Sequence, residues 1–401
     1  MSFLTVEPGQ ASQATTVFLS PETSRHMLIE CLDLYLVEMH LNHTFKASTH
    51  AARTIRHIIV RAGGDGVVGW GEAPVPVEPY YTGETTETAW SIMRDFLGPA
   101  VLGRSWHTVE EFTGFLSRVK GNNIARSGLE MAAWNFLAAA TGRPLVSLLG
   151  GAARNTVEAG VSLGMARDAQ HLCATIQEYV DQGYRRVKLK VGPGADIEVL
   201  RVVRQHFPDL PLMVDANCAY SLRDIPHLRQ FDGFNLMMVE QPLAWDDLTE
   251  HATLQRDLRT PLCLDESLGT SKLVSRALEL DSCRVVNIKS ARLGGLLEAV
   301  RAHDICRAAG APVWCGGMLD FGISRAANIA LSALPGFTLP GDISGSDKYF
   351  DRDVVVPETR AYDGLIKVPD TAVPYVVDED YLAACTRRHV RITTGNGNLT
   401  G

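Results

Sequence analysis

The sequence predicts an α/β chain: a (β/α)7β-type TIM barrel with an α+β capping domain built from the N-terminal region and the C-terminal segment. Three observations favour this fold class. Apolar, strand-like runs that each end in a charged residue recur about every 25 residues in the middle of the chain, the length of one strand and one helix with their loops. A helical pattern follows most of these runs. β-rich segments precede and follow the whole series, as expected for a second domain.

Shifts in composition divide the 401-residue chain into five parts. Residues 1–26 are polar and rich in Ser and Thr, and we expect a disordered extension. Residues 27–150 form the α+β capping domain, and residues 151–345 form the modified TIM barrel. Residues 346–390 return to short β-like runs that we expect to pack back on the capping domain. Residues 391–401 are expected to be a disordered tail.

Three β-rich runs open the capping domain and predict an antiparallel three-stranded sheet. They span residues 30–41, 54–63 and 67–74. Helical patterns then fill residues 85–149. The first helix is expected to begin near Thr85 or Thr86, and Gly142 with Pro144 is expected to end the last one.

Eight strand-like runs define the barrel. They span residues 158–164, 185–191, 211–217, 235–242, 261–267, 284–290, 311–317 and 336–343. Seven or eight alternating units on one chain predict a closed parallel barrel. An open doubly wound sheet would carry a Gly-rich phosphate-binding turn after its first strand, and the sequence has none there.

Composition excludes several classes of partner. The formal net charge of −8 gives no basic surface for nucleic acid or anionic lipid. No apolar run reaches the roughly 18 residues that a membrane-spanning helix needs, and the N-terminus lacks the pattern of a signal peptide. The 8 cysteines are scattered without a CxxC pair, as is typical of reduced thiols. We therefore expect a cytoplasmic protein that binds neither nucleic acid nor membrane.

Asp215, Glu240 and Asp265 each end a predicted strand, at the end of the barrel where TIM-barrel enzymes have their active sites. Three unpaired anions there would raise one another's pKa values, and a hard divalent cation resolves this repulsion. An all-oxygen site favours Mg²⁺, with Mn²⁺ as the alternative. One such acid is equally well explained as a helix cap, but three at one spacing favour a metal site. Asn217, two residues after Asp215, is expected to point to the same side and to support the metal ligands.

Three lysines flank these acids. Lys188 and Lys190 stand two residues apart on one predicted strand, so both side chains point into the barrel. A second ammonium beside Lys190 would lower its pKa toward neutrality, as a general base requires. Lys289 follows four strands later, across the barrel, where it could return a proton to the opposite face of a substrate. A salt bridge from Lys289 to Glu240 or Asp265 is the purely structural alternative. A Schiff-base aldolase also uses a barrel lysine, but it would leave the three carboxylates unexplained.

The motifs KxK, D-x-N, EQP, DES and NIK occur in this order and resemble those of the enolase superfamily, on its muconate-lactonizing branch. The segments GEAPVPVEPYYTGE, NIKSARLGG and CGGMLDFGISRAAN are most similar to the N-succinylamino-acid racemase/o-succinylbenzoate synthase group. The resemblance implies Mg²⁺-dependent removal of the α-proton of a small-molecule carboxylate through an enediolate. The implied reaction is N-succinylamino-acid racemisation, o-succinylbenzoate synthesis, or both. It also implies a homo-oligomer.

The resemblance further implies roles for individual residues. Lys190 and Lys289 would be the acid/base pair, with Lys188 tuning Lys190. Arg292 matches the group's K-x-x-R motif and is expected to lower the pKa of Lys289. The implied metal ligands are Asp215, Glu240 and Asp265. The implied substrate contacts are Phe45, Tyr81, Ser162, Gly317 and Met318.

Three positions depart from the group's pattern. Asp320 stands where the group usually has Glu, residues 42–50 form an unusually polar loop, and Asn135 replaces a common Asp. The first two leave the acyl group and side chain of the substrate open. Dipeptide epimerisation and muconate cycloisomerisation are alternatives within the family, whereas a mandelate-racemase-like reaction is disfavoured because residues 311–317 contain no His. A barrel that binds an acidic metabolite without turnover is the alternative from another class, and two opposed lysines argue against it.

Overall fold

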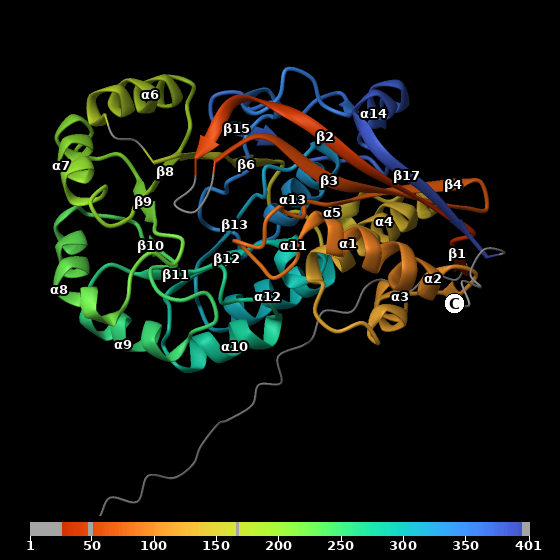
Figure 1. The fold of residues 1–401 in the computed structure, drawn as a ribbon, viewed down its shortest axis with the longest axis horizontal. Coiled ribbons are helices and arrows are strands. Elements are labelled where there is room, and N and C mark those ends of the chain that lie inside the picture. Colours follow the sequence, from red (N-terminus) through yellow and green to blue (C-terminus); the bar gives the residue numbers. More distant parts are fainter. Residues whose placement is uncertain (1–25, 47–50, 166–167, 395–401) are drawn as a thin grey trace, which may run out of the picture.

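The computed structural model describes residues 26–46, 51–165 and 168–394, and it confirms the predicted fold class: a parallel barrel beside an antiparallel capping sheet (Figure 1). Apart from His26, the N-terminal extension expected at residues 1–26 lies outside these ranges. None of the helices within them is both long and apolar enough to cross a membrane.

The capping sheet has four antiparallel strands in the order β17-β2-β3-β4. They are β2 (Cys31–Lys46), β3 (Ala51–Gly64), β4 (Val67–Ala73) and β17 (Thr386–Thr393). The three N-terminal strands form the predicted antiparallel sheet, but β2 continues to Lys46 and β3 begins at Ala51, so the expected loop at residues 42–50 is wrong for residues 42–46. The fourth strand comes from the far end of the chain. This strand corrects the prediction that a disordered tail begins at residue 391. It continues to Thr393 because the buried Ile392 keeps the register opposite Leu32.

Helices fill the rest of the capping region. They are α1 (Thr86–Ile92), the π-helical turn η1 (Met93–Leu97), α2 (Gly98–Val101), α3 (Val109–Leu116), α4 (Asn123–Thr141) and α5 (Leu145–Leu148), with a small pair β1 (Met27–Leu28) and β5 (Ser105–Trp106) beside them. The first helix begins where predicted, because Thr85 and Thr88 cap each other's backbone N–H groups. Helix α4 lies directly on β4: a Cβ added to Gly71 would be 2.0 Å from the carbonyl oxygen of Gly128.

Within the described part of the chain, the barrel sheet has seven parallel strands that follow one another in chain order. They are β7 (Gly160–Leu163), β8 (Arg186–Lys190), β9 (Leu212–Asp215), β10 (Val239–Glu240), β11 (Leu262–Leu264), β12 (Val285–Ile288) and β13 (Val313–Cys315). The helical segments after these strands are α6 (Ala169–Asp181), α7 (Ile197–His206), η2 (Leu222–Asp224), α8 (Ile225–Leu228), η3 (Arg229–Gly233), α9 (Thr249–Asp257), α10 (Ser271–Glu279), α11 (Ser290–Leu293), α12 (Leu296–Ala308) and α13 (Gly322–Ser332). Figure 1 shows α6 to α10 around the outside of the barrel.

An apolar layer fills the barrel interior. It consists of the buried side chains of Met213, Met238, Cys263, Val285 and Trp314. The first three stand two residues before the three predicted metal ligands, and alternation along a strand turns residues at i and i+2 to the same side. The predicted carboxylates therefore stand directly above this apolar layer.

The predicted eighth strand, residues 336–343, closes the barrel without forming a regular strand. Phe337 makes an isolated parallel bridge to β13, and Gly341 makes one to the residue before β7. Pro340 lies between these bridges and has no N–H to continue a ladder. The segment nevertheless occupies the position between the last and first strands.

The C-terminal segment contacts both parts of the molecule. It contains η4 (Ser346–Lys348), β14 (Val355–Val356), β15 (Leu365–Lys367), β16 (Val376–Val377) and α14 (Glu379–Cys385). Strand β15 pairs with β6 (Thr156–Glu158) next to the barrel, β14 pairs with β16, and the chain then returns to the capping sheet through β17. The domain boundaries at residues 150 and 345 stay predictions.

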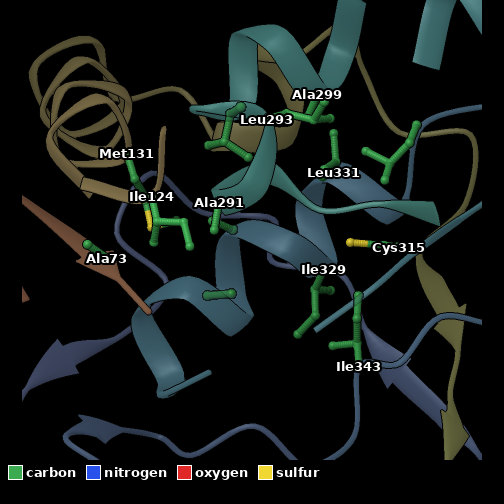
Figure 2. Close-up of a cluster of buried hydrophobic side chains, with 14 of the residues drawn as sticks. Ala73, Ile124, Met131, Ala291, Leu293, Ala299, Cys315, Ile329, Leu331 and Ile343 are labelled. Atoms are coloured by element: carbon green, nitrogen blue, oxygen red, sulfur yellow. The ribbon is translucent and has the colours of Figure 1, made fainter. Parts of the chain in front are cut away.

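Capping region and barrel share one hydrophobic core (Figure 2). Ile124 and Met131 of α4 belong to the same buried cluster as Ala291 and Leu293 of α11 and Ile329 of α13. The capping region is thus packed against the helices that follow β12 and β13. This packing holds the capping loops beside the mouth of the barrel.

Candidate active site

Strand register brings the predicted charges to one end of the barrel. Lys190 of β8 lies opposite Asp215 of β9, and Glu240 of β10 lies opposite Asp215 on its other side. Asp265 and Lys289 follow directly after β11 and β12. The three carboxylates are at most 1% exposed, so the surrounding lysines must compensate their charge inside the protein.

Lys190 is held by residues of the neighbouring strand and the loop after it. Its Nζ donates to Asp215 Oδ2 and to Asn217 Oδ1, both at 2.6 Å. The backbone N–H of Asn217 also donates to Asp215 Oδ1 at 3.0 Å. Asn217 therefore contacts both groups, but not for the predicted reason. It lies beyond β9 with a φ of 43°, so the loop rather than strand alternation orients it.

Lys188 is bound by three carboxylates. Its Nζ lies 2.6 Å from Asp342 Oδ2, 3.1 Å from Glu240 Oε2 and 3.3 Å from Asp215 Oδ2. Burial alone would lower the pKa of Lys188, but these carboxylates outweigh it and raise that pKa well above its ordinary value. Lys188 is thus a fixed positive charge that shares one Asp215 oxygen with Lys190.

Lys289 is held by the barrel on one side and by the capping region on the other. Its Nζ donates to Asp265 Oδ2 at 2.8 Å and lies 4.5 Å from the centroid of the Tyr81 ring. The Tyr81 hydroxyl donates to Asp265 Oδ1 at 2.8 Å. Burial alone would lower the pKa of Lys289, but Asp265 and Tyr81 outweigh it and raise that pKa.

The lowering of the Lys289 pKa predicted from Arg292 is therefore not found. Arg292 is 2% exposed, and its guanidinium contacts Asp265 and two backbone carbonyls. Its Nη1 donates to Asp265 Oδ1, its Nε donates to Leu268 O at 2.8 Å and its Nη2 donates to Asn287 O at 2.6 Å. Although burial opposes the charge on Asp265, Lys289 and Arg292 hold the pKa of that carboxyl well below its usual range.

The donor types at this end of the barrel fit a hard cation, since the three predicted ligands offer only carboxylate oxygens. Within the described ranges, however, no three His, Cys, Asp or Glu side chains are gathered as a ready metal cluster. Lys188 bridges Asp215 and Glu240, and Lys289 engages Asp265. Burial and the neighbouring Asp215 raise the pKa of Glu240 to about 8, so the charged form of this carboxyl is disfavoured, and a bound cation would favour it. The three carboxylates would hold a cation once these ion pairs part.

A cavity of about 350 Å³ lies between the barrel mouth and the capping region. All three lysines line it. Four of the five predicted substrate contacts also line it: Tyr81, Ser162, Gly317 and Met318. The fifth, Phe45, is on β2, and its side chain lies outside the described part of the structure.

Three charged residues of the site were missed at the sequence level. Asp342 accepts from Lys188 and, at 2.7 Å, from Arg186 Nη1. Glu266 lines the cavity, accepts from Asn217 Nδ2 at 3.0 Å and keeps Oε2 buried without a partner among the described residues. The available signals were the position of Arg186 on the same strand as Lys188 and the strand-end positions of the two acids.

Two of the positions that depart from the group's pattern support the fold. Asp320 accepts from Met318 N at 3.0 Å and from Ser324 Oγ at 2.8 Å, so it fixes the cavity-lining loop between β13 and α13. Asn135 Nδ2 donates to Trp70 O at 2.6 Å inside the capping region, and it does not line the cavity.

Comparison with known proteins agrees with this architecture. The family model described as "Mandelate racemase / muconate lactonizing enzyme, N-terminal domain" matches residues 32–150, and "Enolase C-terminal domain-like" matches residues 171–372. A crystal structure of an enolase superfamily member from Listeria innocua superposes with a TM-score of 0.88 at 36% identity, covering 92% of this chain and 100% of that chain.

Curated relatives carry two different activities in their names. An o-succinylbenzoate synthase of Geobacillus stearothermophilus is 46% identical over 87% of this chain and 94% of its own length. An N-succinylamino acid racemase of Thermus thermophilus is 43% identical over 86% of this chain and 93% of its own length. The chain therefore belongs to the enolase superfamily, in its mandelate racemase/muconate lactonizing enzyme family.

Proposed function

We propose that this chain is a Mg²⁺-dependent enzyme that exchanges the α-proton of a small-molecule carboxylate, with N-succinylamino-acid racemisation as its reaction. The placement of Lys190 and Lys289 carries the proposal. They stand on or directly after β8 and β12, which three other strands separate in the barrel sheet, and both line one cavity. A substrate α-carbon between them would face one lysine on each side.

In racemisation, one lysine acts as a neutral amine and takes the α-proton while the C–H electron pair moves into the carboxylate as an enediolate. The other lysine acts as an ammonium and gives its proton to the opposite face of the same carbon, so the configuration inverts and the charges balance. Asp265 Oδ2 lies 2.8 Å from Lys289 Nζ and favours its ammonium form before a cation engages this carboxylate. Lys289 can therefore donate a proton to the substrate when Lys190 is the lysine that removes the α-proton.

Asp215, Glu240 and Asp265 would hold the cation. A bound Mg²⁺ would offset the negative charge that develops on the substrate carboxylate during proton removal, and Mn²⁺ could supply the same charge. Two of these side chains are already oriented by neighbours: Asn287 Nδ2 donates to Glu240 Oε1 at 2.8 Å, and Arg292 binds Asp265.

The same lysines support o-succinylbenzoate synthesis as a second candidate, favoured by the names of close relatives. Lys190 would take the α-proton and then give it to the leaving hydroxide, which departs as water. Lys289 would remain an ammonium and stabilise the enediolate, a role that its ion pair with Asp265 favours. Both reactions pass through the same type of intermediate, so one site can perform both.

We further propose a cytoplasmic homo-oligomer. All eight cysteines are free thiols, as expected in a reducing compartment. Closed symmetric assembly is the common arrangement of soluble enzymes, and light scattering of the purified chain tests it.

The decisive experiment measures both reactions with and without Mg²⁺. Loss of optical rotation from N-succinyl-L-phenylalanine would support the racemase, and conversion of the cyclohexadiene precursor to o-succinylbenzoate alone would assign the synthase. Lys289→Ala should reduce racemisation on the order of 10²–10⁴-fold, whereas Lys272→Ala, which removes an exposed lysine of α10, should leave it intact. Absence of both reactions in the Mg²⁺-loaded wild-type protein would refute the proposal.

A further inference from the structure

The two candidate bases are held by different parts of the molecule. Among the described residues, the hydrogen-bond acceptors of Lys190 Nζ are Asp215 and Asn217, both in the barrel. Lys289 Nζ instead combines a barrel acceptor, Asp265, with the ring of Tyr81. Tyr81 belongs to the capping region, in the segment between β4 and α1.

Tyr81 reaches Lys289 in two ways. Its hydroxyl donates to one oxygen of Asp265 at 2.8 Å, while Lys289 donates to the other oxygen at 2.8 Å, so a single carboxylate joins the phenol and the ammonium. The face of the Tyr81 ring lies 4.5 Å from Lys289 Nζ, within the range of a cation–π contact. The side chain of Lys289 is only 9% exposed, so these contacts leave little freedom for its ammonium.

We propose that Tyr81 is a positioning residue for Lys289. Packing of the capping segment against the barrel places this lysine for proton transfer on one face of the substrate, whereas the barrel alone places Lys190. This inference rests on the proposed function. It adds to the substrate contact expected of Tyr81, because it concerns the geometry of a base rather than the binding of the substrate.

The asymmetry has a stereochemical consequence. In a two-base racemase each enantiomer presents its α-proton to one lysine, so exchange with D₂O from one enantiomer reports on Lys190 and exchange from the other reports on Lys289. Loss of Tyr81 should slow exchange from one enantiomer only. A side chain that merely binds substrate or supports the fold would affect both enantiomers equally.

The experiment follows loss of the α-proton by NMR, separately from N-succinyl-L-phenylalanine and N-succinyl-D-phenylalanine, in D₂O with Mg²⁺. Lys289→Ala identifies the enantiomer that depends on Lys289. Tyr81→Leu removes both the ring and the hydroxyl. It should slow α-proton exchange from that enantiomer about tenfold or more, and exchange from the other enantiomer less than about threefold. Tyr81→Phe keeps the ring and should have an intermediate effect. Equal slowing of both enantiomers would overturn the proposal.

Tyr80→Leu serves as the matched control, because it removes the neighbouring ring, which is 61% exposed. It should change both exchange rates by the same factor. An enantiomer-specific effect of Tyr80→Leu as large as that of Tyr81→Leu would contradict a specific role of Tyr81.

A second measurement does not depend on turnover. Reductive methylation with formaldehyde, quantified by mass spectrometry, reports how freely each lysine amine is reached. Tyr81→Leu should raise the methylation rate of Lys289 several-fold relative to that of Lys190, and an unchanged ratio would overturn the inference. If the wild-type protein exchanges neither enantiomer, the proposed function fails, and this ratio alone decides on Tyr81.

Discussion

Lys190 and Lys289 face the same cavity, but their surroundings arise in different ways. Lys190 binds residues 25 and 27 positions away, on the adjacent strand and its loop. Lys289 depends on Asp265 together with Tyr81, two residues that are 184 positions apart in the chain. The surroundings of Lys190 therefore follow from parallel strand register together with the loop after β9. The surroundings of Lys289 exist only when the capping region is packed on the barrel.

The largest effect that tests this comparison should come from removing either lysine. Lys190→Ala and Lys289→Ala should each reduce racemisation of N-succinyl-phenylalanine on the order of 10²–10⁴-fold, the usual contribution of one acid/base group. Each variant should still exchange the α-proton of one enantiomer, and the two variants should spare opposite enantiomers. Racemisation at the wild-type rate by either variant would contradict the two-base account.

The next largest effect concerns Arg292, a buried residue that contacts Asp265, the ion-pair partner of Lys289. Arg292→Met removes one of the three described donors to Asp265, which keeps Tyr81 and Lys289, and also removes the Arg292 donors to two backbone carbonyls. We expect a loss of about 3–5 kcal/mol in the free energy of unfolding. Arg284→Met is the control. Because Arg284 is exposed, this substitution should lower the free energy of unfolding by less than about 0.5 kcal/mol. Urea denaturation measures both. Equal losses would mean that the Arg292 contacts contribute nothing specific.

Glu130 tests the junction between capping region and barrel through pH. It stands on α4 and accepts from Leu296 N and Leu297 N at 2.8 Å, where α12 begins. Burial raises the pKa of Glu130 to about 7 despite these donors. Protonation of Glu130 therefore favours the folded state. This stabilisation is complete below about pH 4.5 and is lost as the pH rises to about 7.

Between pH 4.5 and pH 7, the free energy of unfolding of the wild type should accordingly fall by about 3 kcal/mol relative to that of Glu130→Gln. Above pH 7 it should fall little further. Urea denaturation of both proteins across this range gives the difference. A difference that stays constant with pH would show that the Glu130 carboxyl titrates normally in the folded protein.

The smallest effect is expected at the edge of the capping sheet. Arg387 of β17 lies 2.9 Å from Glu38 Oε1, but its side chain is 57% exposed. Arg387→Ala should therefore cost less than about 1 kcal/mol in urea denaturation, as is usual for exposed ion pairs. A loss comparable to that of Arg292→Met would mean that the capping sheet, rather than the barrel, dominates stability.

Local rules predicted most, but not all, of the charged residues that the barrel contributes to the site. Asp215, Glu240 and Asp265 could be predicted because parallel strands end at one edge, and spacing alone identifies strand ends. The same rule placed Lys188 and Lys190 on one strand. It did not reveal that Lys188 would be bound by Asp342, because the eighth run closes the barrel through isolated bridges.

The remaining contacts depend on how distant segments meet, which one sequence does not encode locally. Tyr81 was predicted only as a substrate contact on a capping loop, and its bond to Asp265 appears only in the packed molecule. Strand β17 was missed for the same reason, since its partner β2 lies at the other end of the chain. The pKa of Lys289 was predicted in the wrong direction because that prediction used only the charge of Arg292. The salt bridge weighed as the structural alternative is formed with Asp265, and it raises the pKa.

A crystal structure with Mg²⁺ and N-succinyl-L-phenylalanine would show whether the two lysines face opposite sides of the substrate. We expect the substrate α-carbon between Lys190 and Lys289, with each Nζ within about 3.5 Å on opposite faces, and the cation on Asp215, Glu240 and Asp265. Both lysines on the same face of the α-carbon, or a cation bound away from these three carboxylates, would contradict this expectation.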